Sequence, residues 1–203
     1  MIDVLDYGLG NFASVIRMIE KVGGSARRIC TPEQILSADK LILPGVGHFD
    51  HGMSQILDRK FLEPLRERVV IQGTPILGIC LGMQLLCAGS EEGSLPGLGF
   101  VDADVRKFQA QHDQNLKIPH MGWNAIRVTR PNPLAETTGE EQRFYFVHSY
   151  HVVPHASNLS IMMATHGIEF CAAFQSENIY GVQFHPEKSH RFGMALMKKF
   201  VEL

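Results

Sequence analysis

The sequence predicts an α/β protein: a mostly parallel, doubly wound sheet flanked by helices, with an additional antiparallel β portion in the second half. Short apolar runs alternate with helical patterns along the first half of the 203 residues, and the runs LILP and PILGI are continuously apolar. Strands that helices cover on both faces have this composition, whereas strands with one solvated face alternate. The second half instead shows short β-type segments joined by polar or glycine-containing turns.

The first half opens with a strand pattern in MIDVLDYG. A helical pattern follows over 11–24, with apolar residues three or four positions apart, and Gly23-Gly24 ends it. Residues 51–71 and 81–88 supply further helices. The other strands predicted here are SARRI, KLILP and TPILGIC.

The second half predicts six strands and one closing helix near 190–202. No internal repeat, low-complexity tract or linker interrupts the chain, so residues 1–203 are expected to form one domain. The predicted strands are 99–108, 123–129, 143–148, 158–164, 168–175 and 179–184.

Composition excludes several classes of protein. Hydrophobic residues make up 45% and charged residues 20%, and the net charge is −2, so the chain lacks the basic surface of a nucleic-acid-binding protein. No apolar run approaches the length of a membrane span, and MIDVLDYGLG lacks the basic and apolar regions of a signal peptide. The four cysteines show no CxxC spacing and are expected to be free thiols. We therefore expect a cytoplasmic protein.

The first turn, DYGLGNFA, fits the dinucleotide-binding pattern G-x-G-x-x-A through Gly8, Gly10 and Ala13. That pattern also expects an acidic residue about 20 positions later, at the end of the second strand. Here the second strand reads ARRIC, and only Arg27 or Arg28 could meet a 2′-phosphate. A plain tight turn is the better interpretation.

Cys80 has the spacing of a nucleophile held at a sharp bend. A strand that ends at Ile79 and a helix that begins near Leu81 leave Cys80 in the turn, and Gly78 and Gly82 flank it as G-x-C-x-G. Side chains at either glycine would crowd such a turn. The bend directs the sulfur to the start of a helix, where a thiolate is favoured, and makes the Leu81 amide an oxyanion donor. The alternative is a small buried hydrophobic residue, a common role for cysteine.

A thiol nucleophile needs a base, and the base needs a group that orients it. The segment NIYGVQFHPEKSH places His185 directly after an apolar run, with Glu187 two residues later. If that run is a strand of the same sheet, His185 reaches the edge that Cys80 faces, and Pro186 stiffens the turn so that Glu187 can hold the imidazole. The alternative is a surface histidine beside an exposed glutamate.

Together, GICLGMQLL and GVQFHPE resemble the triad segments of class I (triad-type) glutamine amidotransferases, and LILPGVGHFDHGM resembles their oxyanion segment. The resemblance extends over essentially the whole chain. It implies that Cys80, His185 and Glu187 hydrolyse the side-chain amide of glutamine. It further implies an oxyanion hole at Val46, Gly47 and Leu81, and substrate contacts at Gly45, Gln84, Ser149 and Tyr150.

This family implies neither a metal nor an organic cofactor. His48 and His51 in GHFDHG give an HxxH spacing, but a metal site there is a weak alternative.

Within this class, DYGLGN, PHMGWN and FVHSYHV resemble the glutaminase subunits of imidazole glycerol phosphate synthases. Those subunits form a heterodimer with a (β/α)₈ barrel synthase and pass ammonia to it through a tunnel, for histidine biosynthesis. The resemblance implies that L-glutamine is the substrate and that one face docks on the barrel. The residues in the segments that resemble this docking face are Asn11, Met121, Trp123, Asn124 and Lys188. For Trp123, partial burial in the sheet of the second half is the competing interpretation.

Three departures from the usual pattern leave the partner open: His190, where a glycine is commoner, His151, where a second aromatic residue is common, and GNFASV in the first helix. A paralogous subunit could donate ammonia to a surface-polysaccharide sugar to form an amidine. A catalytically silent binding subunit and a stand-alone hydrolase of γ-glutamyl peptides are further alternatives. The intact triad disfavours the silent subunit, and the compact length disfavours the hydrolase.

Overall fold

The computed structural model describes residues 1–109, 116–135 and 141–203. Its strands are β1 (Ile2–Leu5), β2 (Ala26–Ile29), β3 (Leu41–Gly45), β4 (Ile76–Cys80), β5 (Gly89–Ser90), β6 (Ala103–Lys107), β7 (His120–Val128), β8 (Gln142–His148), β9 (Tyr150–Pro154), β10 (Ser160–His166), β11 (Ile168–Ser176) and β12 (Ile179–Val182). Its α-helices are α1 (Phe12–Lys21), α2 (Pro32–Leu36), α3 (Phe49–Asp58), α4 (Leu62–Leu65), α5 (Leu81–Leu85) and α6 (His190–Glu202). A π-helix spans Arg66–Ile71, and 3₁₀ turns span Ser157–Leu159 and Pro186–Lys188.

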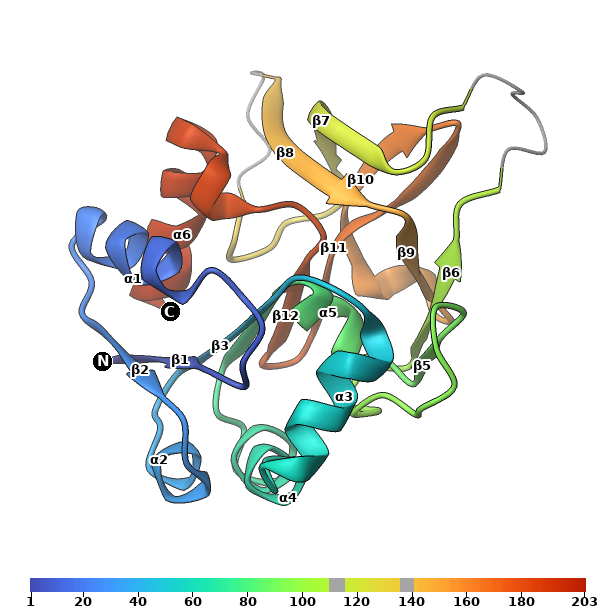
Figure 1. Cartoon of the computed structure of the whole chain (residues 1–203). Helices are drawn as coiled ribbons and strands as arrows, with labels where there is room; N and C mark the ends of the chain where they lie inside the picture. The colour runs from blue at the N-terminus through green and yellow to red at the C-terminus, as the bar shows by residue number, and fades with distance from the viewer. Residues whose placement is uncertain (110–115, 136–140) are drawn as a thin grey trace.

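One sheet of 12 strands runs through both halves of the chain, in the order β2-β1-β3-β4-β12-β11-β10-β7-β8, with β5, β6 and β9 branching from this path (Figure 1). The neighbours from β2 to β12 pair in parallel, and those from β12 to β8 pair antiparallel. The predicted fold class is therefore confirmed. The strand β12 comes near the end of the chain, yet it lies between β4 and β11 in the sheet.

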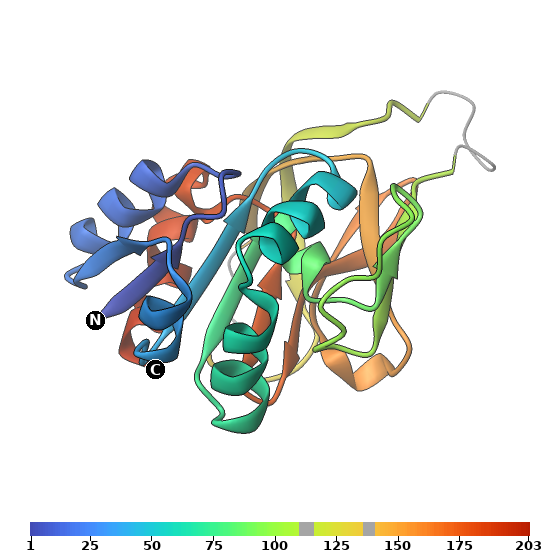
Figure 2. The same cartoon turned by 60° about the horizontal axis from the view of Figure 1, so that its bottom comes forward.

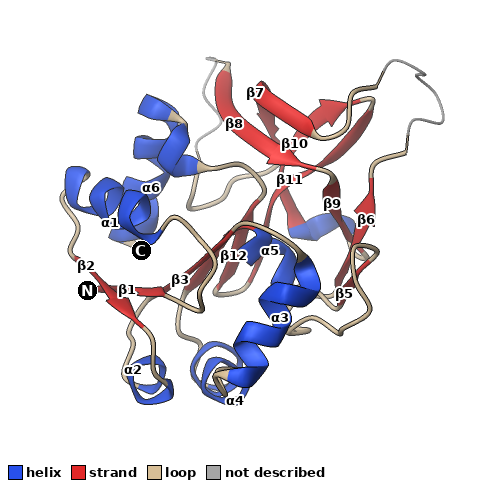
Figure 3. Cartoon of the chain, in the orientation of Figure 1, coloured by secondary structure: helices blue, strands red, loops and turns tan. Residues whose placement is uncertain are grey.

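Helices cover both faces of the parallel part, because successive side chains of its strands point to opposite faces. Leu41 and Leu43 pack into a core with α2, α3, α4 and α5, whereas Ile42 packs into a second core with α1 and α6. Figure 2 shows α3 and α4 lying across one face, and Figure 3 shows how few helices accompany the antiparallel strands. No helix within the described ranges is long and apolar enough to cross a membrane.

The helices are the elements that differ most from the sequence prediction. The expected helix 51–71 is broken after Asp58, where Lys60 adopts a positive φ of 58°, and it continues as α4 and the π-helix. The expected helix 81–88 ends at Leu85. The sequence reading missed β5, β9 and α2, although α2 carries a capping box in which Thr31 and Gln34 bond to each other's backbone.

Candidate active site

Cys80 lies at the junction of β4 and α5, in a backbone conformation that L-residues rarely adopt, with φ 54° and ψ −108°. Such strain persists only where the surrounding structure enforces it, and it is concentrated at functional sites. The cysteine is buried but not sealed, with 7% of its surface exposed. Its neighbours therefore hold the thiol at the end of β4, where the G-x-C-x-G spacing predicted the turn.

The flanking glycines are required by close backbone contacts. A Cβ at Gly82 would lie 1.8 Å from the carbonyl oxygen of Leu43, and a Cβ at Gly78 would lie 2.7 Å from the amide nitrogen of Met83. Neither contact can be relieved by moving a flexible side chain. These contacts bring β3, β4 and α5 together closely enough to fix the turn.

The histidine and glutamate arrive from the other end of the chain. Because β12 pairs in parallel with β4 in the register Ile79↔Val182, the segment after β12 emerges beside Cys80. Nδ1 of His185 lies 2.8 Å from Oε1 of Glu187, and both side chains are almost fully buried. The 3₁₀ turn that begins at Pro186 folds the glutamate back onto the imidazole.

The electrostatics of this pair favour a charged imidazole. Burial alone would lower the pKa of His185, but the interactions with Cys80 and with Glu187 outweigh it and raise that pKa to about 10. Nε2 of His185 is buried and has no conventional hydrogen-bond partner. It is therefore the nitrogen left to exchange a proton with the Cys80 thiol.

A cavity of about 200 Å³ opens at the sulfur. This volume is below the roughly 300–1,000 Å³ of pockets for drug-sized ligands and suits a small metabolite. Cys80 and His185 line it together with all but one of the residues expected to bind substrate or the oxyanion: Val46, Gly47, Leu81, Gln84, Ser149 and Tyr150. The exception is Gly45, which pairs with Cys80 across β3 and β4 and packs against the Tyr7 hydroxyl below the cavity.

Three further residues line the cavity that sequence reasoning missed: Glu92, Val147 and His148. Oε2 of Glu92 accepts a hydrogen bond of 2.9 Å from the backbone N–H of Phe49, which anchors the carboxylate at the pocket wall. His148 is 6% exposed at the end of β8. Val147 and His148 belong to the FVHSYHV segment, but the sequence assigned them no role, and Glu92 lies in the turn after β5, where no sequence pattern marks it.

The expected docking residues fall into two groups. Met121 is 62% and Trp123 42% exposed, so the surface interpretation of Trp123 fits better than burial. Trp123 stacks on His190 at 5.4 Å, and the Lys188 ammonium lies 5.7 Å from the ring centre of Tyr145. These side chains form one aromatic and basic surface.

The two remaining docking residues have roles inside the chain. Asn11 caps α1 by accepting from the N–H of Ser14, and the Asn124 amide donates to the Thr165 carbonyl at 2.8 Å. A second cavity of about 320 Å³ separates α1 from the segment of Glu187 and Lys188.

The side chains expected for the two weaker alternatives, dinucleotide binding and an HxxH metal site, make other contacts. Arg27 and Arg28 pair with Asp3 and Asp6 across β1 and β2, so neither stands ready for a 2′-phosphate. His48 caps α3 by accepting from the N–H of Asp50 at 3.2 Å.

Known proteins are similar to this sequence over its whole length. The sequence model of the family glutamine amidotransferase class-I matches residues 3–203. The chain is 47% identical to imidazole glycerol phosphate synthase subunit HisH 2 of Pseudomonas aeruginosa, over 100% of both chains. It is 48% identical to the subunit HisH 2 of Methanococcus maripaludis, over 100% of this chain and 99% of that one.

Solved structures share the fold at low sequence identity. A glutamine amidotransferase superposes with a TM-score of 0.74 at 18% identity, covering 99% of this chain and 97% of that one. A glutamine amidotransferase from Thermotoga maritima gives a TM-score of 0.64 at 17% identity, with 99% and 80% covered. On the full-length match and the identity to these relatives, the chain belongs to the class-I glutamine amidotransferase family.

Proposed function

We propose that this chain is the glutaminase subunit of a two-subunit amidotransferase, and that it hydrolyses L-glutamine to glutamate and ammonia for imidazole glycerol phosphate formation in histidine biosynthesis. The observation that carries the proposal is that buried Cys80 and His185 line one small cavity, and that buried Glu187 lies 2.8 Å from His185. Its family membership and the names of its full-length relatives support the same reaction.

The reaction begins with attack on the side-chain amide. The Cys80 sulfur forms a bond to the carboxamide carbon of glutamine, and the carbonyl oxygen becomes an oxyanion. Backbone amides of the Val46–Gly47 segment and of Leu81, which line the cavity, are the donors for that oxyanion. Protonated His185 then gives its proton to the nitrogen, the C–N bond breaks, and ammonia leaves.

The second half of the reaction restores the enzyme. The γ-glutamyl group is now a thioester of Cys80, and His185 has become neutral. The imidazole accepts a proton from a water molecule, which attacks the thioester carbon and releases glutamate and the sulfur. Glu187 fixes the ring through Nδ1 in both halves. No metal ion or organic cofactor is needed for either step.

The cavity wall supplies groups for the polar end of glutamine. The Gln84 side-chain amide donates to the carbonyl of Tyr150 at 3.2 Å and to Oε1 of Gln183 at 3.0 Å. Both N–H groups are then used, so the carbonyl oxygen of Gln84 is left to accept from substrate. Glu92 supplies a carboxylate for the α-ammonium group, and Ser149 and Tyr150 complete the wall.

The partner in this proposal is a (β/α)₈ barrel synthase subunit, which forms a heterodimer with this chain in the cytoplasm. The exposed surface of Met121, Trp123 and Lys188, with Asn11 and Asn124 at its margins, is the proposed docking face. We propose that residues 1–203 act as one domain, and the sheet that runs through both halves supports this.

A second acceptor for the ammonia has one observation in its favour. The names of the P. aeruginosa and M. maripaludis relatives carry the number 2, so more than one such subunit is distinguished in those organisms. A paralogous subunit that serves a surface-polysaccharide sugar would retain the same triad and differ in its barrel partner.

The test is glutamate release from glutamine by the purified chain, alone and with each candidate barrel subunit and its nucleotide or sugar ligand. We expect a large rise with the histidine-pathway barrel, and Cys80→Ala should abolish it. A rise only with the sugar-pathway barrel would move the chain to the second acceptor. No turnover with either barrel, and no thioester trapped on Cys80, would reject the glutaminase function.

A further inference from the structure

Gln183 is a buried residue that touches the reacting sulfur. It follows β12, two positions before His185, and is 0% exposed. Its side-chain N–H donates to Sγ of Cys80 with a nitrogen–sulfur distance of 3.7 Å. Gln183 is not among the described residues that line the cavity, so it contacts the Cys80 sulfur from the protein interior and not from the cavity.

The orientation of the Gln183 amide is fixed by a second amide. Oε1 of Gln183 accepts from Nε2 of Gln84 at 3.0 Å, which forces the N–H side of Gln183 toward the sulfur. Gln84 also donates to the Tyr150 carbonyl, so its own amide cannot turn over without losing both acceptors. The Tyr150 carbonyl therefore orients the Gln84 amide, and Gln84 in turn orients the Gln183 N–H group that faces Cys80.

That carbonyl is shared with a pair of buried histidines. Nδ1 of His148 lies 2.7 Å from the oxygen of Tyr150, and Nε2 of His148 lies 2.9 Å from Nδ1 of His120. Nε2 of His120 lies 3.1 Å from the Asn124 amide nitrogen. A carbonyl only accepts and an amide nitrogen only donates, so each ring has one possible neutral tautomer: both rings carry the proton on Nδ1.

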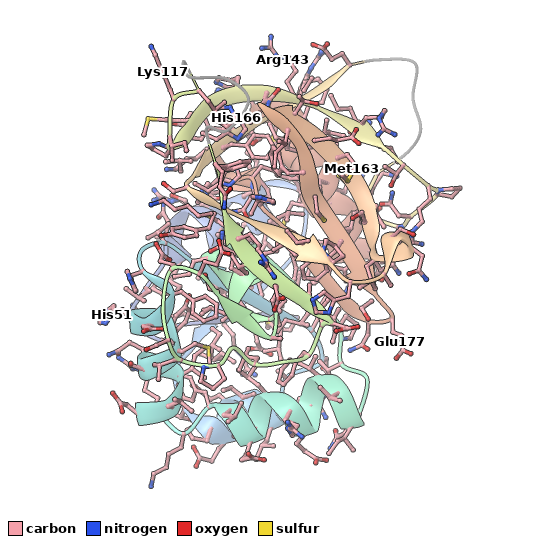
Figure 4. All side chains as sticks on the ribbon, turned by 90° about the vertical axis from the view of Figure 1, so that its right-hand side faces the viewer. His51, Lys117, Arg143, Met163, His166 and Glu177 are labelled. Atoms are coloured by element: carbon pink, nitrogen blue, oxygen red, sulfur yellow. The ribbon has the colours of Figure 1, made fainter. Side chains whose placement is uncertain are left out.

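Both rings are neutral at pH 7. Burial lowers the pKa of His148 to about 3, and burial together with the neighbouring His166 lowers that of His120 to about 4. His120 stacks on His166, whose Nε2 donates to the Lys117 carbonyl at 2.9 Å. Figure 4 labels His166 and Lys117 at one end of the antiparallel strands. The tautomers are thus fixed, and the hydrogen bonds run in one direction from Asn124 to Tyr150.

We propose that Gln183 is a further catalytic residue, which stabilises the Cys80 thiolate by donating a hydrogen bond to it, and that His148 and His120 are positioning residues that act on it through the Tyr150 carbonyl and Gln84. A hydrogen bond to an anion is stronger than one to a neutral group, so the Gln183 contact favours the thiolate over the thiol. The arrangement also connects the nucleophile to Asn124, at the margin of the proposed docking face. The role in turnover rests on the proposed function, whereas the effect on the sulfur does not.

The first test is the alkylation rate of Cys80 by iodoacetamide, followed by mass spectrometry of the peptides. The thiolate sulfur bonds to the reagent's methylene carbon as the C–I bond breaks and iodide leaves, so the rate reports the reactive sulfur without glutamine or a partner. Cys30 is exposed and gives an internal control in each sample. Gln183→Leu should slow Cys80 alkylation by about 10- to 100-fold and leave Cys30 unchanged.

The matched control for this change is Gln175→Leu. The Gln175 amide donates to the Glu177 carbonyl and the Tyr180 hydroxyl, away from the sulfur, and this variant should alkylate at the wild-type rate. Equal or faster alkylation of Cys80 in Gln183→Leu would overturn the proposal, because a residue that only fills space would expose the sulfur when replaced.

The second test separates kcat from KM in the complex with the barrel subunit. Gln183→Leu should lower kcat by about 10- to 100-fold and change KM by less than about 2-fold, since Gln183 acts on the sulfur and not on the substrate. If the wild-type complex releases no glutamate, the glutaminase function fails, while the alkylation result still decides the role of Gln183.

His148 variants test the positioning role. His148→Leu should slow Cys80 alkylation by about 3- to 10-fold, and His148→Asn should recover most of the loss because its amide can donate to the Tyr150 carbonyl from the place of Nδ1. His151→Leu is the matched control, since His151 is equally buried but its Nδ1 has no partner. The positioning role is wrong if His148→Asn stays as slow as His148→Leu, or if His151→Leu is equally slow.

Discussion

The two sides of the candidate active site are held in place by different physical means. On the nucleophile side, β3, β4 and α5 meet at backbone-to-backbone contacts where Gly78 and Gly82 leave no space for a side chain. On the opposite side, β7, β8 and the segment after β12 carry buried polar side chains held by hydrogen bonds: His120, His148, Gln183 and His185. The first side should therefore be sensitive to volume, and the second to hydrogen bonding and protonation.

The largest expected effect comes from Gly82→Ala. Its Cβ would lie 1.8 Å from the Leu43 carbonyl oxygen, so β3 and α5 must separate. We expect the free energy of unfolding to fall by more than about 4 kcal/mol, measured by urea denaturation. Gly89→Ala has open space around its Cβ and should change it by less than about 0.5 kcal/mol. Similar values for the two variants would show that steric contact does not hold this side.

Acid should weaken the polar side next. His148 and His120 have folded-state pKa values of about 3 and about 4, whereas an ordinary histidine has a pKa of 6.5. Between each folded value and 6.5, the unfolded chain therefore binds more protons than the folded chain. Stability is therefore unaffected above pH 6.5 and falls as the pH drops toward 4, by on the order of a few kcal/mol. His148→Asn should flatten this acid limb in urea denaturation at several pH values. An equally steep limb in His148→Asn would assign the acid sensitivity to other groups.

Alkali should act on the stability contributed by the His185–Glu187 pair, in the opposite sense to acid. The pKa of His185 is raised to about 10 in the folded chain, so its stabilisation is complete below pH 6.5 and is lost as the pH rises through about 10. Urea denaturation should show that the free energy of unfolding declines above neutral pH. Glu187→Gln should make this decline smaller, because the charged hydrogen-bond partner of His185 is gone. A decline of the same size in Glu187→Gln would place its origin outside the pair.

An intermediate effect is expected below the cavity, where Gly45 meets Tyr7. A Cβ at Gly45 would lie 2.3 Å from the Tyr7 hydroxyl, which is buried without a hydrogen-bond partner. Gly45→Ala should cost about 2 kcal/mol, while Tyr7→Phe should be neutral or stabilising by about 1 kcal/mol. The double variant should recover about 1 kcal/mol or more in thermal unfolding. Strict additivity of the two changes would contradict a direct contact.

The smallest effect is expected at His190→Gly, on the surface at the start of α6. His190 has a positive φ of 46° and stacks on Trp123, the only tryptophan. Glycine relieves the backbone strain and removes the ring, so the free energy of unfolding should change by less than about 1 kcal/mol. Trp123 emission should shift to longer wavelength. Glu177→Gly, at another positive φ (51°), should not shift it; an equal shift there would contradict the stack.

The difference between the two sides also explains which parts of the fold and of the site could be predicted from the sequence. The strands of the nucleophile side are continuously apolar, and the glycines that flank Cys80 are close in sequence, so both features can be read locally. His185 and Glu187 form a local pair as well. In contrast, His148 ends β8 and Gln183 follows β12, so both approach the site through pairing of distant strands, and Glu92 lies in a turn that no local pattern marks.

The helix errors have local causes of two kinds. The break after α3 is made by Lys60 in a left-handed conformation, where neither glycine nor proline marks it. The missed α2 did carry a recognisable start, since Thr31 and Gln34 are spaced as a capping box with Pro32 between them. His190 adopts a positive φ of 46°, a conformation that glycine adopts without strain.

The insertion of β12 between β4 and β11 also determines when the protein can become reactive. During synthesis β4 and Cys80 leave the ribosome about a hundred residues before β12 and His185, at rates near 5–20 residues per second. Until then, β4 lacks its final neighbour and the thiol lacks its base. The amide hydrolysis proposed for this site therefore requires both segments, and a chain that stops between β4 and β12 would carry Cys80 without His185.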